Sequence, residues 1–189
     1  LTKAESRSFD IEASQFDYRG AVGRLLWIAR TGRPDILYAV NQLGQFSHNW
    51  NMKHVVAAKR VMRYLNGTKD LKLVFHQGES FELRCFADAD FANEPEENDY
   101  PMRSISGIVA YIHGVGPIYS SATLEKTLSL STAEAEYKCT SKAARLCSGF
   151  REFLNEIGFV QDEPTIIYND NQAAVAMVKQ RFSSGRTRH

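Results

Sequence analysis

Apolar residues in the first third of the chain recur every three or four positions, the spacing of amphipathic helices. The pattern predicts a helix over residues 18–30, a second from 34 to about 47, and a third over 52–65. Gly32-Arg33-Pro34 separates the first two helices, since proline suits the first turn of a helix. Asn66-Gly67 suits the end of the third helix. The first part of the chain is therefore expected to be helical.

Residues 83–90 place Leu83, Cys85 and Ala87 on one side and Arg84, Phe86 and Asp88 on the other, a period of two that is typical of a strand. A short strand is also predicted over residues 71–76, a further strand over the β-rich run 106–113, and another from 118 to 121. Short turns between sequential strands favour an antiparallel meander. The polar, acidic residues 93–102 are interpreted as a solvated loop.

A long helix follows, and its start is marked by Ser131-Thr-Ala-Glu134, the pattern of a capping box. This gives Glu134 a structural role. The face of this helix that is expected to face the core carries Thr140, Ala143, Cys147, Phe150, Leu154 and Ile157. Glu136 stands one step earlier on the same face. A carboxylate at the head of an apolar stripe needs a partner, so Glu136 is the better functional candidate.

Two strands end in carboxylates. Asp88 follows the apolar residues of the strand at 83–90, and Asp170 ends an apolar run at 165–170 that precedes a helix at 171–179. One interpretation is that each acid is simply solvated at the end of its strand. The other is that Asp88, Asp170 and Glu136 converge, which raises their pKa values unless a cation is present. Oxygen ligands of this kind favour Mg²⁺ or Mn²⁺, and two such ions can promote attack of water on a phosphodiester.

Composition adds a charge asymmetry to this picture. The chain of 189 residues has a net charge of +1, but residues 1–78 hold 12 Lys and Arg against 6 Asp and Glu, whereas residues 79–189 hold 11 against 16. A basic part joined to an acidic part suggests two units, with nucleic acid as a partner of the first and metal ions as partners of the second. Three cysteines without metal-site spacing indicate reduced core residues of an intracellular protein. No run is apolar enough to span a membrane.

The third predicted helix carries Lys59, Arg60 and Arg63 away from its apolar stripe. Lys59 and Arg63 are one turn apart and therefore adjacent. These residues form either an ordinary solvated face or a surface that contacts nucleic-acid phosphates. No aromatic residues interleave with them, so any contact is expected to be with the backbone rather than with bases.

Motifs along the chain resemble, in order, a known family. Residues 18–29, 33–40 and 58–68 resemble the segment just after the polymerase core in the Pol polyprotein of copia-type LTR retrotransposons. Four later motifs resemble the ribonuclease H domain of that polyprotein: Ala87-Asp-Ala-Asp, Ser106-Gly, Leu130-Ser-Thr-Ala-Glu-Ala-Glu-Tyr and Tyr168-Asn-Asp-Asn-Gln-Ala-Ala. The match covers roughly residues 16–189, and the ordered set is far more specific than any one motif.

The resemblance implies an α/β fold with a mixed sheet. It divides most of the chain into a small helical subdomain like a reverse-transcriptase thumb or connection at 18–78 and an RNase H-like domain at 79–189 that is incomplete at its C-terminus. Residues 1–17 are polar and lack a clear period, and they are predicted to form an N-terminal arm. The chain has no polymerase Tyr-x-Asp-Asp motif, so we expect no DNA synthesis.

The resemblance also implies an activity, which is metal-dependent cleavage of RNA in RNA–DNA hybrids. It makes Asp88, Glu136 and Asp170 both the catalytic residues and the ligands of Mg²⁺ or Mn²⁺. It gives Lys59, Arg60 and Arg63 a role in holding the hybrid. The remainder of the polyprotein is a further expected partner, and the expected location is intracellular: cytoplasmic, in a virus-like particle, or nuclear.

Two departures from the family leave a second interpretation open. The family continues past His189 into a further helix, a strand and an Ala-Asp motif with a fourth carboxylate. The segment before the capping box is also altered, and reads Ala122-Thr-Leu-Glu-Lys. The chain begins with Leu1 rather than Met, which suggests a fragment. The alternative is thus a truncated or domesticated, catalytically inactive module that binds nucleic acid or a protein partner.

Overall fold

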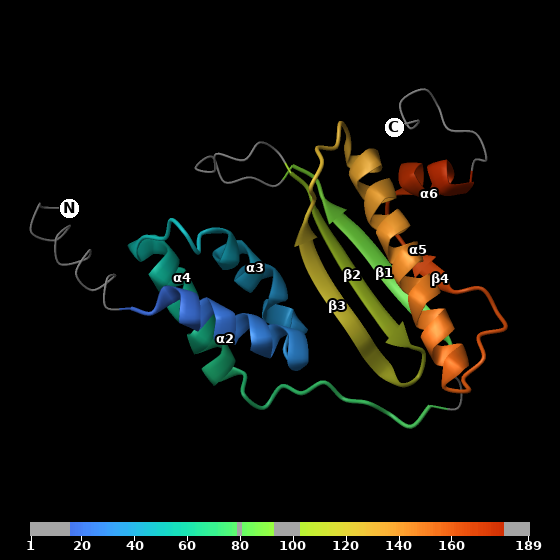
Figure 1. Cartoon of the computed structure of the whole chain (residues 1–189), viewed down its shortest axis with the longest axis horizontal. Helices are drawn as coiled ribbons and strands as arrows, with labels where there is room; N and C mark the ends of the chain where they lie inside the picture. The colour runs from blue at the N-terminus through green and yellow to red at the C-terminus, as the bar shows by residue number, and fades with distance from the viewer. Residues whose placement is uncertain (1–15, 79–80, 93–102, 180–189) are drawn as a thin grey trace, which may run out of the picture. The chain divides into compact units, whose positions relative to one another are not determined.

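The computed structural model describes residues 16–78, 81–92 and 103–179 (Figure 1). The chain divides into two compact units, Leu1–Leu73 and Val74–His189. Most of the predicted N-terminal arm and the whole of the predicted loop at 93–102 lie outside the described residues. Within the described residues, no helix is both long and apolar enough to cross a membrane.

The first unit is helical, as its sequence pattern predicts. It consists of α2 (Tyr18–Thr31), the short 3₁₀ helix η1 (Pro34–Ile36), α3 (Leu37–Gln45) and α4 (Met52–Gly67). The second predicted helix therefore starts as a 3₁₀ turn at its proline and becomes an α-helix at Leu37.

One face of each of these helices forms the core of the unit. Tyr18 is 1% exposed, and its hydroxyl donates a hydrogen bond to the carbonyl of Leu43 at 2.7 Å. Burial raises the pKa of Tyr18 to about 12. Other buried residues of this core are Ala21, Val22, Leu25, Ala29, Ile36, Leu37, Val40, Leu43, Val55 and Ala58. The apolar stripes thus pack against one another, and each helix keeps a polar face outside.

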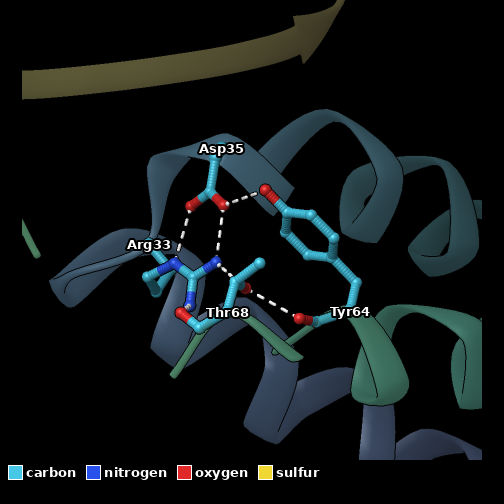
Figure 2. Close-up of polar contacts among 4 residues, drawn as sticks. All are labelled: Arg33, Asp35, Tyr64 and Thr68. Atoms are coloured by element: carbon cyan, nitrogen blue, oxygen red, sulfur yellow. Dashed lines mark hydrogen bonds and ion pairs between the residues drawn. The ribbon is translucent and has the colours of Figure 1, made fainter. Parts of the chain in front are cut away.

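A polar network joins the turn before α3 to the end of α4 (Figure 2). Arg33 donates two hydrogen bonds to the carboxylate of Asp35, at 3.0 and 2.8 Å, and others to the carbonyl and hydroxyl of Thr68. The Tyr64 hydroxyl donates to Asp35 at 2.9 Å. Bidentate pairs of this kind are among the stronger polar contacts in proteins. The network therefore ties together segments that are about thirty residues apart in sequence.

The second unit is built on a four-stranded mixed sheet of order β3-β2-β1-β4 (Figure 1). Its strands are β1 (Leu83–Asp90), β2 (Ile105–Ile112), β3 (Gly116–Leu124) and β4 (Ile166–Tyr168). The first three form the predicted antiparallel meander. The short β4 pairs with β1 in the parallel direction, with Phe86 opposite Tyr168. The fold is a mixed α/β fold that is consistent with an RNase H-like architecture.

The long helix α5 (Thr132–Glu156) packs on one face of this sheet, and α6 (Gln172–Lys179) follows β4. The core between sheet and helix holds alternate residues of β1, such as Cys85 and Ala87, together with Ala143 and Cys147 of the predicted stripe of α5. Cys139, which the predicted stripe does not include, is also part of this core. The prediction that Ile157, the last member of that stripe, belongs to the core is wrong, because Ile157 lies just after the helix and is 51% exposed. All three cysteines are free and buried, as predicted.

The predicted strand over residues 71–76 is absent. This segment has no ladder of paired residues, although the backbone N–H of His76 donates to the carbonyl of Val115 at 2.9 Å. Leu71, Val74 and Phe75 are each more than half exposed. Strand-forming residues make a strand only where a neighbouring strand can satisfy their backbone groups. Here the N–H of Leu71 bonds back to the carbonyl of Thr68 at 3.1 Å, and His76 makes the bond to Val115.

We expect Asp35→Asn to lower the free energy of unfolding of the helical unit by about 1 kcal/mol at neutral pH, because a partly exposed, charge-assisted network is weakened. The hydrogen bond from Arg33 is the main cause that holds the pKa of Asp35 below its ordinary value. The ionised carboxylate therefore stabilises the fold above the unfolded-state pKa, and this contribution is lost as the pH falls through the lower folded-state pKa.

Both tryptophans, Trp27 and Trp50, lie in this unit, so urea unfolding followed by tryptophan fluorescence reports on it. Asp70→Asn is the matched control, because Asp70 is an exposed acid of the same unit. The difference between wild type and Asp35→Asn should shrink as the pH is lowered below about 4. A difference that stays constant across that range would contradict the assignment.

Candidate metal centre

Two of the three candidate carboxylates are brought to the same edge of the sheet by the parallel pairing of β1 and β4. Asp88 stands near the carboxyl end of β1, on the face away from the buried Ala87 and Ala89. Asp170 follows two residues after the end of β4. Carboxyl ends of parallel strands meet at one edge, where ligand sites of α/β sheets commonly form.

The third carboxylate comes from the first turns of α5. Ser131 caps this helix and accepts a hydrogen bond from the N–H of Glu134 at 3.2 Å. The Glu134 carboxylate accepts hydrogen bonds from the N–H of Leu130 at 2.7 Å and from the ammonium of Lys138 at 2.8 Å. Glu134 therefore has the structural role predicted for it, although its backbone partner is Leu130 rather than the capping residue Ser131. Glu136 lies on the opposite side and is only 3% exposed.

The three acids converge. One carboxylate oxygen from each of Asp88, Glu136 and Asp170 lies within 4.8 Å of the others. In the described part of the chain, this is the one group of three or more acidic, histidine or cysteine side chains close enough to share a metal ion. A shallow hollow of about 330 Å³ opens beside Asp88 and Asp170 and is also lined by Phe86, Tyr168 and Asn169.

The pKa of Glu136 is raised above its ordinary value, first by burial and also by the neighbouring charges of Asp88 and Asp170. Hydrogen bonds from the Asn169 side chain and the Ala89 backbone act in the opposite direction. A buried carboxylate among like charges is costly, and a cation removes that cost. The all-oxygen donor set is of the hard type that Mg²⁺ or Mn²⁺ prefers, so the residues present fit a divalent cation.

Asn169 belongs to this arrangement, although it was not among the candidates selected from the sequence. Its amide nitrogen lies 2.9 Å from Oε2 of Glu136 and 3.1 Å from the carbonyl oxygen of Ala87. The one sequence signal for it was its position immediately before a candidate ligand, Asp170. A search restricted to carboxylates passes over it.

A second cluster of polar side chains joins β2, the residue after β3, and α5. Glu125 is 5% exposed; it accepts hydrogen bonds from the hydroxyl of Ser106 and from the ammonium of Lys142, the latter at 2.6 Å. Its carboxylate is paired with a cation of α5, so it is part of the scaffold and lies outside the three-acid cluster.

The predicted nucleic-acid contacts lie in the other unit. Lys59, Arg60 and Arg63 are all exposed on α4. Their spacing of three and four residues places Lys59 and Arg60 each beside Arg63. The ammonium of Lys59 also lies over the ring of Phe16, at 5.6 Å. These residues form a continuous basic surface on one helix.

Comparison with known proteins gives homologous sequences over most of the chain. It is 35% identical over 173 residues, 92% of its length, to the retrovirus-related Pol polyproteins from transposons RE1 and RE2 of Arabidopsis thaliana. It is 33% identical over 172 residues to the corresponding polyprotein from transposon TNT 1-94 of Nicotiana tabacum. The chain spans only 11–12% of the length of these relatives.

Neither the family models nor the solved structures gave a match. The sequence homologues nevertheless agree in kind and extend across both units, with similar identity in each of the three plant polyproteins. The chain therefore belongs to the family of copia-type, retrovirus-related Pol polyproteins of transposons, of which it represents one segment.

Proposed function

We propose that this segment carries the ribonuclease H function of a retrotransposon Pol polyprotein, cleaving the RNA strand of RNA–DNA hybrids with Mg²⁺ or Mn²⁺. The observation that carries the proposal is the convergence of Asp88, Glu136 and Asp170 within 4.8 Å at one edge of a mixed sheet. Membership of a Pol polyprotein family supports it, since such a chain acts in a retroelement.

The three acids differ in burial, and their proposed roles differ accordingly. Glu136 is buried and fixed by hydrogen bonds, so its carboxylate offers a rigid ligand. Asp88 and Asp170 are exposed, so they face the hollow from which a substrate phosphate can approach. Bound divalent ions would supply activation of water and stabilisation of the leaving oxygen. The protein's contribution is to hold three oxygens close together despite their mutual repulsion.

The basic surface of α4 supports the choice of nucleic acid as substrate. Lys59, Arg60 and Arg63 offer three exposed positive charges, which suit phosphate contacts that are independent of sequence. Selection of the RNA strand would depend on its 2′-hydroxyl groups near the cleavage site. The rest of the polyprotein, about nine tenths of its length, is proposed as a further partner.

We expect Asp88→Asn to reduce cleavage of a labelled RNA–DNA hybrid by about 100-fold or more, because metal-assisted charge stabilisation contributes several kcal/mol. The measurement is single-turnover cleavage in Mg²⁺ and then in Mn²⁺. Asp162→Asn is the matched control, since Asp162 is an exposed acid of the same unit outside the cluster. It should leave the rate unchanged.

Two outcomes would count against the proposal. Equal activity of wild type and Asp88→Asn would assign the cleavage to a different site. A folded wild-type chain that cleaves no hybrid in either metal, yet binds it, would favour the alternative of a catalytically inactive module that binds nucleic acid.

We expect Arg60→Gln combined with Arg63→Gln to weaken hybrid binding and to flatten its dependence on salt. For every phosphate that the variant no longer neutralises, the slope of log affinity against log salt should fall by about 0.9. Fluorescence anisotropy across a salt series measures both effects. The pair Lys69→Gln and Lys72→Gln removes the same charge from exposed positions of the same unit and is the control. Equal weakening by the two pairs would show a general charge effect.

A further inference from the structure

Asn169 links the three chain segments that carry the candidate metal ligands: it belongs to one of them and contacts the other two. It immediately precedes Asp170 in the chain. Its side-chain nitrogen donates to the carbonyl of Ala87, the residue before Asp88, at 3.1 Å. The same nitrogen donates to Oε2 of Glu136 at 2.9 Å. In the described structure, one amide therefore links β1, α5 and the end of β4 at the point where their acids meet.

The backbone around Asn169 explains why its side chain is available for this. The parallel ladder between β1 and β4 ends at the pair Phe86 and Tyr168. Beyond that pair, the Asn169 side chain bonds to the next residue of β1, Ala87, so it extends the attachment of the two strands. A side chain thus takes over where the backbone ladder stops.

The orientation of the amide is fixed from its other end. The oxygen Oδ1 of Asn169 accepts a hydrogen bond from the N–H of Asn171 at 2.9 Å. If the amide were flipped, its oxygen would face the Glu136 carboxylate and its nitrogen would face an N–H group. Both contacts would be repulsive, so the NH₂ group must point at Glu136.

The Glu136 side chain is placed by the same group of contacts. The hydroxyl of Thr140, one turn along α5, donates to the Glu136 carbonyl at 2.9 Å and lies 3.2 Å from the Asn169 nitrogen. The backbone N–H of Ala89 also bonds to the Glu136 carboxylate. The bond from Asn169 holds Oε2 of Glu136, and the carboxylate, which has two oxygens with two lone pairs each, keeps acceptor capacity for a cation.

We propose that Asn169 is a positioning residue for the metal site, which orients the Glu136 carboxylate toward Asp88 and Asp170 and so raises the affinity for a divalent cation. The inference rests on the proposed function, because it assumes that the three acids bind metal. Residues that orient a metal ligand commonly change metal affinity by about 10–100-fold when removed.

The test is Mn²⁺ binding by the full chain, measured from the electron paramagnetic resonance signal of free Mn²⁺. Asn169→Leu keeps the approximate volume and removes both donors, and Asn169→Ala provides a second variant should leucine not be tolerated. Circular dichroism establishes that each variant is folded. We expect the dissociation constant for Mn²⁺ to rise about tenfold in both. Asn155→Ala is the matched control, since Asn155 makes a structural bond to Gln161 near the far end of α5.

A double-mutant cycle separates positioning from a general structural effect. If Asn169 acts through Glu136, its replacement in a Glu136→Gln background should weaken Mn²⁺ binding little further. The same tenfold weakening in both backgrounds, or none in the wild-type background, would overturn the inference while leaving the metal site in place. A folded wild-type chain that binds no Mn²⁺ would instead overturn the proposed function, and this inference with it.

Discussion

The parallel pairing of β4 with β1 is the constraint on which the candidate metal centre depends. The first three strands alone would leave Asp88 at a sheet edge with no second strand-end acid beside it. Because β4 runs in the same direction as β1, Asp170 arrives at the same end of the sheet. The helix α5 packs on one face of the sheet and contributes Glu136 from its first turns. Three segments distant in sequence therefore meet at one edge.

This convergence has a cost that the surrounding residues offset only in part. Glu136 is 3% exposed, and burial is the first cause that raises its pKa. Asn169 and Ala89 donate hydrogen bonds to it, yet the charges of the two neighbouring acids remain. A fold optimised for stability alone would hardly collect three acids here, since an apolar group of similar size at Glu136 would avoid both penalties. Acids held together against their repulsion are a feature of binding and catalytic sites.

Much of this arrangement could be predicted from the sequence, because the signals are local. The alternation in residues 83–90 predicts a strand with the bounds that are observed, and the capping pattern at Ser131 predicts the start of α5. The helical spacing of the apolar residues up to Cys147 then indicates that Glu136, rather than Glu134, faces the core. Asp170 is predicted as a candidate because the apolar run at 165–170 ends in its carboxylate. Each candidate ligand is therefore visible as an acid at the end of a periodic element, before any contact between elements is known.

The features that the sequence did not reveal all depend on contacts between distant segments. Residues 71–76 are rich in apolar residues, as many strands are, but this composition does not supply a neighbouring strand to pair with. Asn169 is one amide in a polar tetrapeptide, and its role depends on Ala87 and Glu136, which are 82 and 33 residues away. The same holds for Glu125, whose partner Lys142 is 17 residues along the chain. Periodicity identifies the elements and the acids they carry, whereas the residues that hold those acids in place are recognised only once the elements are packed.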